Sequence, residues 1–305
     1  MVRYLTRRVL LIPVALFYIT LLTFIATRLS GDPTVLMLPP DATLEDIQAY
    51  RHRIGLDEPI HVQYVRFLSG ILQGDFGRSL HFRQDSLELV LSRLPATAEL
   101  TLAAMAMAVP IGVGAGVLSA TRSGSLLDDV TSVFVLLGQS IPVFWLGLMM
   151  ILLFSVRLGL FPVYGRGGPE HLVLPAVALA AYSTARIARL TRSSVIEVQR
   201  EDYVRTARAK GLAERRVLWV HVMKNSAIPV VTVIGLQVGA MFAGAVVTET
   251  VFAWPGLGML ITQAVFTRDY PVIVAAVFVS SLVFMLAALL VDLSYMLFNP
   301  RLRYE

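Results

Sequence analysis

Six long apolar runs constrain the fold of this chain more than any other feature of the sequence. They cover residues 9–27, 97–120, 130–156, 172–190, 227–253 and 271–298. Each is close to or longer than the roughly 20 residues that an α-helix needs to cross a bilayer. Because the backbone must satisfy its own hydrogen bonds in hydrocarbon, helices are the natural form for such runs. The sequence predicts an all-α polytopic membrane protein with six transmembrane helices.

The balance of residue types excludes a soluble globular enzyme. Hydrophobic residues make up 56% of the chain and charged residues 15%, whereas soluble domains have about 45–50% and about 25%. The net charge of +5 is compatible with nucleic acid binding or with basic cytoplasmic loops, so the positions of the charges must decide. The chain has no cysteine, which excludes disulfides and thiolate metal sites.

The basic residues are distributed asymmetrically among the loops. With the N-terminus inside, sixteen of the 26 fall on the cytoplasmic side, ten of them between Arg186 and Lys224. The two short outer loops hold Arg157, Arg166 and Arg268. The positive-inside rule then predicts cytoplasmic N and C termini and explains the excess charge without nucleic acid. The 19-residue first run exceeds a signal-peptide core of about 7–15 residues, so we expect it to be retained as a span.

The runs divide the chain into three parts. Residues 1–28 form an N-terminal tail and first transmembrane helix, residues 29–95 an extracytoplasmic subdomain, and residues 96–305 a five-helix core with a cytoplasmic loop at 191–226. Within the subdomain, residues 41–56 predict a short helix capped by Asp41 or Thr43. Apolar residues recur at helical spacing just beyond it, at Tyr64, Phe67, Leu68 and Ile71. A docking surface and a plain ordered loop are both open interpretations of this subdomain.

Residues 192–231 are too polar to span and are rich in helix-forming residues. Helices are therefore expected on both sides of Gly211, which would end the first with left-handed geometry or a tight turn. Pro229 is expected to mark the beginning of the fifth span. A short basic helix held between two spans can dock into a groove on another protein. A basic loop can also serve orientation alone.

The cytoplasmic loop contains DYVRTARAKGL at 202–212 and NSAIPVV from Asn225. It resembles the cytoplasmic loop of ATP-binding-cassette importer permeases, and within them that of the dipeptide, oligopeptide, nickel and glutathione branch. Ala207 and Gly211 match the general pattern. Arg205 and Thr206 replace its Glu and Ala, and the spacer to the proline is longer, as in the peptide branch. Further short matches occur in the same order along the chain: GDP, GLDEP with QY, GDFGRS, LPAT, IPVFWLG, ARLTRSS, ETVFAWPGLG, RDYPV, VDLSY and NPRLRY.

This resemblance implies the type I importer permease fold in the bacterial inner membrane. It implies a coupling helix that contacts an ATPase subunit, formed by Arg205, Thr206, Ala207, Arg208, Ala209, Lys210, Gly211 and Leu212. The implied partners are a homologous second permease, two ATPase subunits or domains, an extracytoplasmic solute-binding protein and the lipid bilayer.

The chain is expected to have no cofactor and no enzymatic activity of its own. It lacks the GxxxxGK[ST] loop, so ATP and Mg are expected on the partner subunits. The solute is expected to be a dipeptide, an oligopeptide, glutathione or a nickel chelate. A self-contained secondary carrier or channel is the alternative function.

Polar residues inside the spans are candidates for the translocation pathway, because they are costly in the membrane and are often functional. These are Gln139, Ser140, Gln237, Thr248 and Glu249. Gln139 and Ser140 could instead satisfy a carbonyl freed by a kink at Pro142. Glu249 could make an interhelical hydrogen bond or an outer ion pair. Asp292 is expected to be an interfacial anchor.

Two remaining patterns favour structural interpretations. Gly112, Gly114 and Gly116 form a GxGxG within an apolar run rather than after a strand, which favours close helix packing over dinucleotide binding. The five histidines are scattered and form no HExxH motif. We therefore expect no metal and no catalytic residues.

Overall fold

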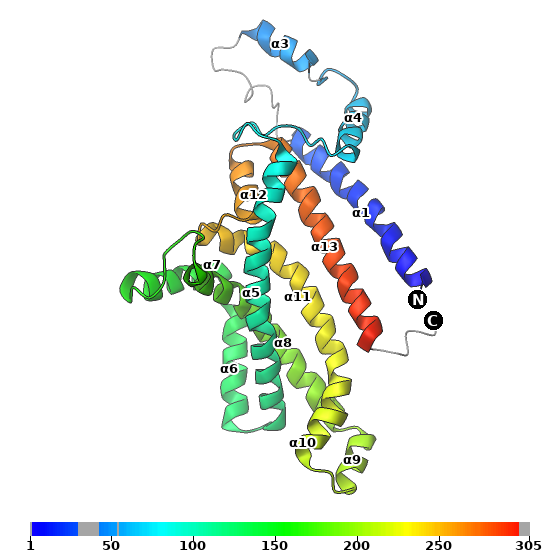
Figure 1. The fold of residues 1–305 in the computed structure, drawn as a ribbon, viewed down its shortest axis with the longest axis vertical. Coiled ribbons are helices and arrows are strands. Elements are labelled where there is room, and N and C mark those ends of the chain that lie inside the picture. Colours follow the sequence, from blue (N-terminus) through cyan, green and yellow to red (C-terminus); the bar gives the residue numbers. More distant parts are fainter. Residues whose placement is uncertain (1, 30–42, 54, 299–305) are drawn as a thin grey trace. The chain divides into compact units, whose positions relative to one another are not determined.

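The computed structural model describes residues 2–29, 43–53 and 55–298, and Figure 1 shows that this part of the chain is built from helices. The described residues contain one β-type pairing, an isolated antiparallel bridge between Arg78 and Asp85. The helices are α1 (Val2–Leu29), α3 (Leu44–Arg53), α4 (Ile60–Leu72), α5 (Ser86–Thr121), α6 (Leu126–Ser140), α7 (Val143–Met150), the π-helix η1 (Ile151–Arg157), α8 (Pro169–Gln199), α9 (Asp202–Ala209), α10 (Glu214–Arg216), the π-helix η2 (Val217–Val222), α11 (Met223–Val251), α12 (Leu257–Phe266) and α13 (Tyr270–Phe298).

The predicted all-α membrane fold is confirmed, and its spans need correction, most of all the third. Five stretches are single helices long and apolar enough to cross a membrane: Val9–Leu29, Ser86–Thr121, Pro169–Gln199, Glu214–Phe242 and Tyr270–Leu290. The third predicted run, 130–156, is not one straight helix. It is divided between α6 and the pair α7–η1, which are bent by 104° relative to each other.

Proline chemistry explains this break. Ile141 is extended, with φ −80° and ψ 122°, and Pro142 has φ −60° and ψ 134°. A residue before proline is pushed out of the α region by the pyrrolidine ring, so α6 ends at Ser140 and a new helix starts at Val143. The expected kink at Pro142 is therefore a complete helix break.

Two further boundaries differ from the prediction. The fourth span does not end near residue 190, because α8 continues to Gln199 with Arg186 and Arg189 exposed on one face and Ile187 and Val195 buried on the other. Pro229 does not begin the fifth span, because residues 214–251 are helical throughout and Pro229 lies inside α11. One proline removes a single backbone donor, which membrane helices tolerate.

The chain forms two compact units. Unit 2 contains Val2–Pro95 and Met259–Met285, and unit 1 contains Ala96–Gly258 with the part of α13 that begins at Leu286. The three-part division expected from the sequence stays a prediction, as does the cytoplasmic placement of the termini.

In unit 2, the two helices expected in the first loop are present as α3 and α4. Thr43 caps α3, since its hydroxyl accepts from the Asp46 amide at 3.2 Å while its own amide donates to Asp46 at 3.0 Å. The Thr43 hydroxyl, which donates to the Asp46 carboxylate at 2.7 Å, and the Thr43 amide lower the pKa of this carboxyl below its ordinary value. The alternative cap, Asp41, lies outside the described residues. Helix α4 packs on α1 through Tyr64, whose ring lies 5.3 Å from that of Phe24.

A buried carboxylate joins two sequence motifs in unit 2. Asp269, in RDYPV, accepts from the Ser79 hydroxyl of GDFGRS at 2.5 Å and from the His81 amide at 3.1 Å. Asp269 and Ser79 are both buried. The loop after α4 is thereby fixed to the turn between α12 and α13.

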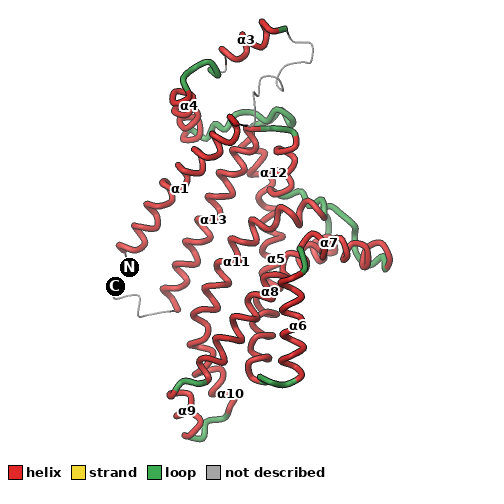
Figure 2. Tube along the Cα trace, turned by 180° about the vertical axis from the view of Figure 1, so that it is seen from behind, coloured by secondary structure: helices red, strands yellow, loops and turns green. Residues whose placement is uncertain are grey.

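The core of unit 1 lies between α5, α8 and α11, and includes the fully buried Leu100, Ile187 and Trp254. Figure 2 shows α5 and α6 as neighbouring helices joined by a short loop. A Cβ at Gly112 would lie 2.9 Å from Ile187 of α8, and one at Gly116 would lie 2.6 Å from the Ala188 carbonyl oxygen. The expected packing role is confirmed at these two glycines, whereas a Cβ at Gly114 would meet nothing within 4 Å.

Candidate functional site

Helix α9 carries most of the predicted coupling segment and has two chemically distinct faces. Val204 and Ala207 are buried, while Arg205, Arg208 and the other residues of α9 are exposed. The helix starts at Asp202, three residues before the predicted segment, and ends at Ala209. The last three predicted residues, Lys210, Gly211 and Leu212, form the turn that follows it.

A Schellman motif ends α9. The Gly211 amide donates to the Arg208 carbonyl at 2.9 Å, and the Leu212 amide donates to the Ala207 carbonyl at 3.4 Å. Gly211 has φ +76°, the left-handed conformation that glycine adopts without a Cβ penalty. The predicted left-handed helix end at Gly211 is confirmed, and it turns the chain directly into α10.

The buried face of α9 belongs to an apolar cluster, which we call the coupling core. Its buried members come from α5, α8, α9 and η2, and they are Ala120, Val195, Val204, Ala207, Val217 and Val222. Leu212 packs against it from the turn. The cluster therefore packs α9 directly against the ends of α5 and α8.

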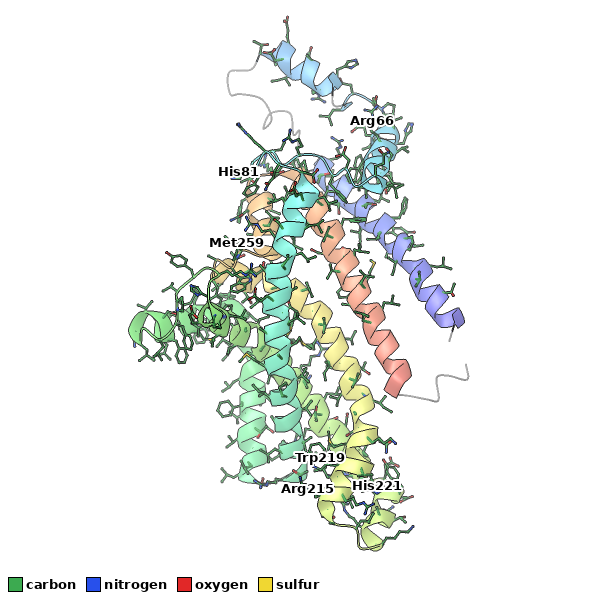
Figure 3. All side chains as sticks on the ribbon, viewed as in Figure 1. Arg66, His81, Arg215, Trp219, His221 and Met259 are labelled. Carbon is green, nitrogen blue, oxygen red and sulfur yellow. The ribbon has the colours of Figure 1, made fainter. Side chains whose placement is uncertain are left out.

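The exposed face of α9 presents basic side chains beside acidic ones. Arg205 pairs with Asp202, and Arg208 pairs with Glu214 at 2.8 Å. Such exposed pairs contribute little to stability. Arg215, Trp219 and His221, labelled in Figure 3, lie on α10 and η2 at the same end of unit 1. Trp219 is 57% exposed there.

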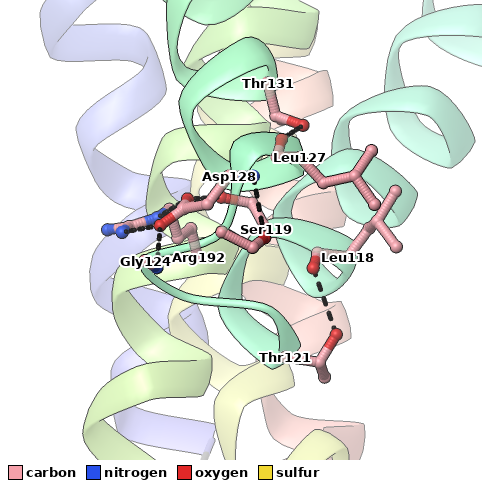
Figure 4. Close-up of polar contacts among 9 residues, drawn as sticks. Leu118, Ser119, Thr121, Gly124, Leu127, Asp128, Thr131 and Arg192 are labelled. Atoms are coloured by element: carbon pink, nitrogen blue, oxygen red, sulfur yellow. Dashed lines mark hydrogen bonds and ion pairs between the residues drawn. The ribbon is translucent and has the colours of Figure 1, made fainter.

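Figure 4 shows a second polar cluster, which we call the Asp128 clasp. It joins Ser119 of α5, Gly124 of the connecting loop, Asp128 of α6 and Arg192 of α8. Arg192 donates from Nε to Oδ1 and from Nη2 to Oδ2 of Asp128, both at 2.8 Å. The Gly124 amide donates to Oδ2 at 3.0 Å, and the Ser119 hydroxyl donates to Oδ1. The single carboxylate thus accepts four hydrogen bonds and is 4% exposed.

The sequence did not single out this clasp. Asp128 precedes the third apolar run and Arg192 follows the fourth, so neither interrupts a span or carries an obvious insertion cost. The available signal was their placement, since an acid at the beginning of one span and a base at the end of the next can meet when the two helices pack side by side.

A third cluster lies around the turn after α11, and we call it the Trp254 knot. Glu249 is fully buried and accepts from the Thr97 hydroxyl at 2.6 Å. Thr97 in turn accepts from the Leu257 amide at 2.7 Å, and Trp254 donates from Nε1 to the Ala96 carbonyl at 2.8 Å. The knot joins the LPAT and ETVFAWPGLG motifs.

The pathway candidates fall in different surroundings. Gln237 is 1% exposed and donates to the Ser183 hydroxyl of α8 at 2.7 Å. Thr248 is also buried. Gln139 and Ser140 end α6 next to the break, with Ser140 exposed. Thr248 and Glu249 are consecutive residues of α11. The role of all five residues in the pathway stays a prediction.

Two family models match the chain. Residues 112–304 match the binding-protein-dependent transport system inner membrane component, and residues 1–101 match the N-terminal part of the corresponding membrane component. The chain belongs to this family. It is therefore an ATP-binding-cassette importer permease, a multi-pass protein of the bacterial inner membrane.

Relatives of this permease match over their full length. It is 42% identical to the di/tripeptide transport system permease protein DppB of Pseudomonas aeruginosa, and 40% identical to the dipeptide transport system permease protein DppB of Escherichia coli K12. It is also 42% identical to the glutathione transport system permease protein GsiC of Salmonella typhi. Each comparison covers 100% of both chains.

Solved structures share the permease fold. The inward-facing MetNI methionine ABC transporter matches with a TM-score of 0.58 at 20% identity, over 69% of this chain and 96% of that one. An amino acid ABC transporter with histidines matches with a TM-score of 0.52, over 70% and 94%.

Proposed function

We propose that the permease forms half of a translocation pathway for short peptides and couples it to a separate ATPase through α9. The observation that carries this proposal is the two-faced character of α9, whose basic face is exposed and whose apolar face is fixed in the coupling core. The names of the full-length relatives, which include di/tripeptide and glutathione permeases, favour short peptides as the solute. Glutathione is itself a tripeptide, so both names describe the same chemical class.

The partners in this proposal are those of a binding-protein-dependent importer. A second permease completes the pathway, an extracytoplasmic binding protein delivers the solute, and two ATPase subunits or domains hold ATP and Mg. Arg205, Arg208 and Lys210 would enter a groove on an ATPase lined by acceptors, as short amphipathic helices do when they dock.

The geometry supports a simple sequence of movements. Closure of the ATPases displaces α9, and the coupling core passes this displacement to α5 and α8. These helices also form the centre of unit 1, so their rotation as a rigid body would switch the pathway between inward and outward opening. Gln139, Ser140, Gln237, Thr248 and Glu249 remain the candidate contacts for the solute.

The test of coupling is transport by the complete complex reconstituted in vesicles with ATP. We expect Gly211→Ala and the double charge reversal R205E/R208E to lower transport per ATP hydrolysed about tenfold, the scale of energetic coupling between distant sites. Arg122→Glu, an exposed charge reversal at the loop after α5, is the control. Normal transport per ATP in the α9 variants would contradict the coupling role.

The same vesicles distinguish the alternative function. A secondary carrier would transport without the ATPase when an ion gradient is imposed, whereas the permease should require ATP and its ATPase. Transport driven by a gradient in vesicles containing this chain alone would overturn the importer proposal.

The proposed orientation can be tested separately, because the chain has no native cysteine. With both termini and α9 in the cytoplasm, an introduced Lys210→Cys should be protected from an impermeant thiol reagent in intact cells. Phe266→Cys, at a position 84% exposed in α12, should be labelled. The reverse labelling pattern would show that the termini and α9 lie outside, opposite to the proposed orientation.

A further inference from the structure

The Asp128 clasp ties α6 to the end of unit 1 that bears α9. Arg192 lies seven residues before the end of α8, a distance of roughly 10 Å along the helix axis. The buried members of the coupling core come from α5, α8, α9 and η2. Helix α6 joins this end through Asp128, whose carboxylate contacts both α5 and α8.

Helix α6 is also held against α8 near its other end. A Cβ at Gly138 would lie 3.1 Å from the Ala185 side chain and 3.2 Å from the Ala181 carbonyl oxygen. Gln139, Ser140 and the break before α7 come directly after Gly138 in the chain. A movement that reaches α6 at Asp128 is therefore carried to two of the pathway candidates.

The chemistry of the clasp favours a role in geometry over one in stability alone. A buried ion pair contributes little net stability, because desolvation offsets much of the attraction between the charges. A guanidinium that binds a carboxylate through two parallel hydrogen bonds does, however, fix orientation as well as distance. The Ser119 hydroxyl and the Gly124 amide bind the same carboxylate, so α5, α6 and α8 share one fixed reference point.

We propose that Asp128 and Arg192 are positioning residues that make α6 follow α8 and the coupling helix during each transport cycle. This inference rests on the proposed coupling function of α9. It assigns the pair a role in transmission rather than in docking of the ATPase, since Asp128 is buried and lies on a different element from α9.

The first experiment uses the complete complex and removes both charges together. D128N/R192Q leaves no uncompensated buried ion. It should therefore disturb membrane insertion and assembly less than either single substitution does. We expect the ATPase to co-purify and to hydrolyse ATP as in the wild type, while transport per ATP falls about tenfold. D129N/R189Q is the matched control on exposed neighbours of the same two helices, and it should transport as the wild type does.

A graded series covers the possibility that the double variant does not assemble. Arg192→Lys keeps the charge but loses the two-point contact, and Ser119→Ala removes one hydrogen bond to the carboxylate. Transport per ATP should decrease from wild type to Ser119→Ala to Arg192→Lys. Unchanged transport per ATP in every assembled variant would overturn the proposed positioning role of Asp128 and Arg192. If the α9 variants also transport normally, the coupling proposal itself fails.

The second experiment measures motion directly and does not depend on disrupting the clasp. Spin labels at Leu126→Cys on α6 and Arg200→Cys at the end of α8 report the distance between the two helices in the assembled complex. Both positions are exposed. We expect one distance that stays unchanged between the nucleotide-free and ATP-bound states. A distance that changes with ATP in the otherwise wild-type chain would overturn the proposal.

Discussion

The Trp254 knot and the Asp128 clasp both include a residue of helix α5 and use different chemistry. Thr97 of the Trp254 knot and Ser119 of the Asp128 clasp both lie on α5. They are 22 positions apart in the sequence, roughly 33 Å along a helix, which is close to the roughly 30 Å thickness of the bilayer core. The spacing indicates that α5 places one cluster at each edge of the membrane.

The difference between the clusters lies in what surrounds the buried carboxylate. In the knot, Glu249 is fully buried beside the Thr97 hydroxyl and the indole of Trp254 is 1% exposed. In the clasp, Asp128 binds a guanidinium whose side chain remains 35% exposed. A closed, densely packed cluster holds one shape. The ion pair between Asp128 and the partly exposed Arg192 can instead stay formed while α8 moves, without exposing the apolar core of unit 1.

The largest effect is expected from removing the centre of the knot. Trp254→Ala leaves a cavity and removes the indole hydrogen bond to the Ala96 carbonyl, which should lower the free energy of unfolding by about 3–5 kcal/mol. Trp219→Ala removes the same side chain at a site 57% exposed and should change little. Thermal unfolding of the purified protein in detergent measures both. Equal losses would show that the knot is no more closed than the surface around α10.

A smaller effect is expected from the glycines that bring α5 and α8 together between the two clusters. Gly116→Ala places a Cβ 2.6 Å from the Ala188 carbonyl oxygen, and such overpacking costs about 1–3 kcal/mol. Gly114→Ala, two residues away and open on all sides, should be neutral or slightly stabilising, because alanine favours helix. The difference in melting temperature between these two variants tests the α5–α8 contact directly.

The hydroxyl of Thr97 should contribute less than the packing around it. Thr97→Val keeps the volume but leaves the Leu257 amide without its acceptor, at an expected cost of about 1–2 kcal/mol. Thr131→Val is the control, because its hydroxyl bonds to the Leu127 carbonyl of its own helix on an exposed surface. If Thr131→Val lowers the free energy of unfolding as much as Thr97→Val does, burial in the knot does not strengthen the hydrogen bond of Thr97.

Sequence reasoning predicted the parts of this molecule that depend on local chemistry. Apolar run length predicts spans, and Gly211 predicts the end of a helix, because both follow from the preferences of a few consecutive residues. The break at Pro142 was expected only as a kink, since nothing local says how far the second helix turns after the chain leaves the α region. The extension of α8 past Arg189 was missed because burial of one helical face depends on a neighbouring helix.

The clusters could not be predicted for a related reason. LPAT and ETVFAWPGLG, or GDFGRS and RDYPV, are separate matches in the sequence and become single structures only when distant segments pack. Asp128 and Arg192 are 64 positions apart, and each is an ordinary charged residue near the end of a span. Pairing of this kind is set by tertiary packing, which a single sequence does not specify.

The smallest structural effect is expected from Glu249→Gln, and it separates the two roles open to this residue. Glutamine keeps the oxygen that accepts from Thr97 and nearly the same volume, so the free energy of unfolding should change by about 1 kcal/mol or less. If Glu249 serves only the knot, transport and the preference among short peptides should also remain unchanged. If it meets the solute during the cycle, removing its charge should alter that preference even though the protein stays folded. Uptake of cationic, neutral and anionic dipeptides by the reconstituted complex distinguishes these results, with Thr97→Val as the variant that disturbs the knot and keeps the charge.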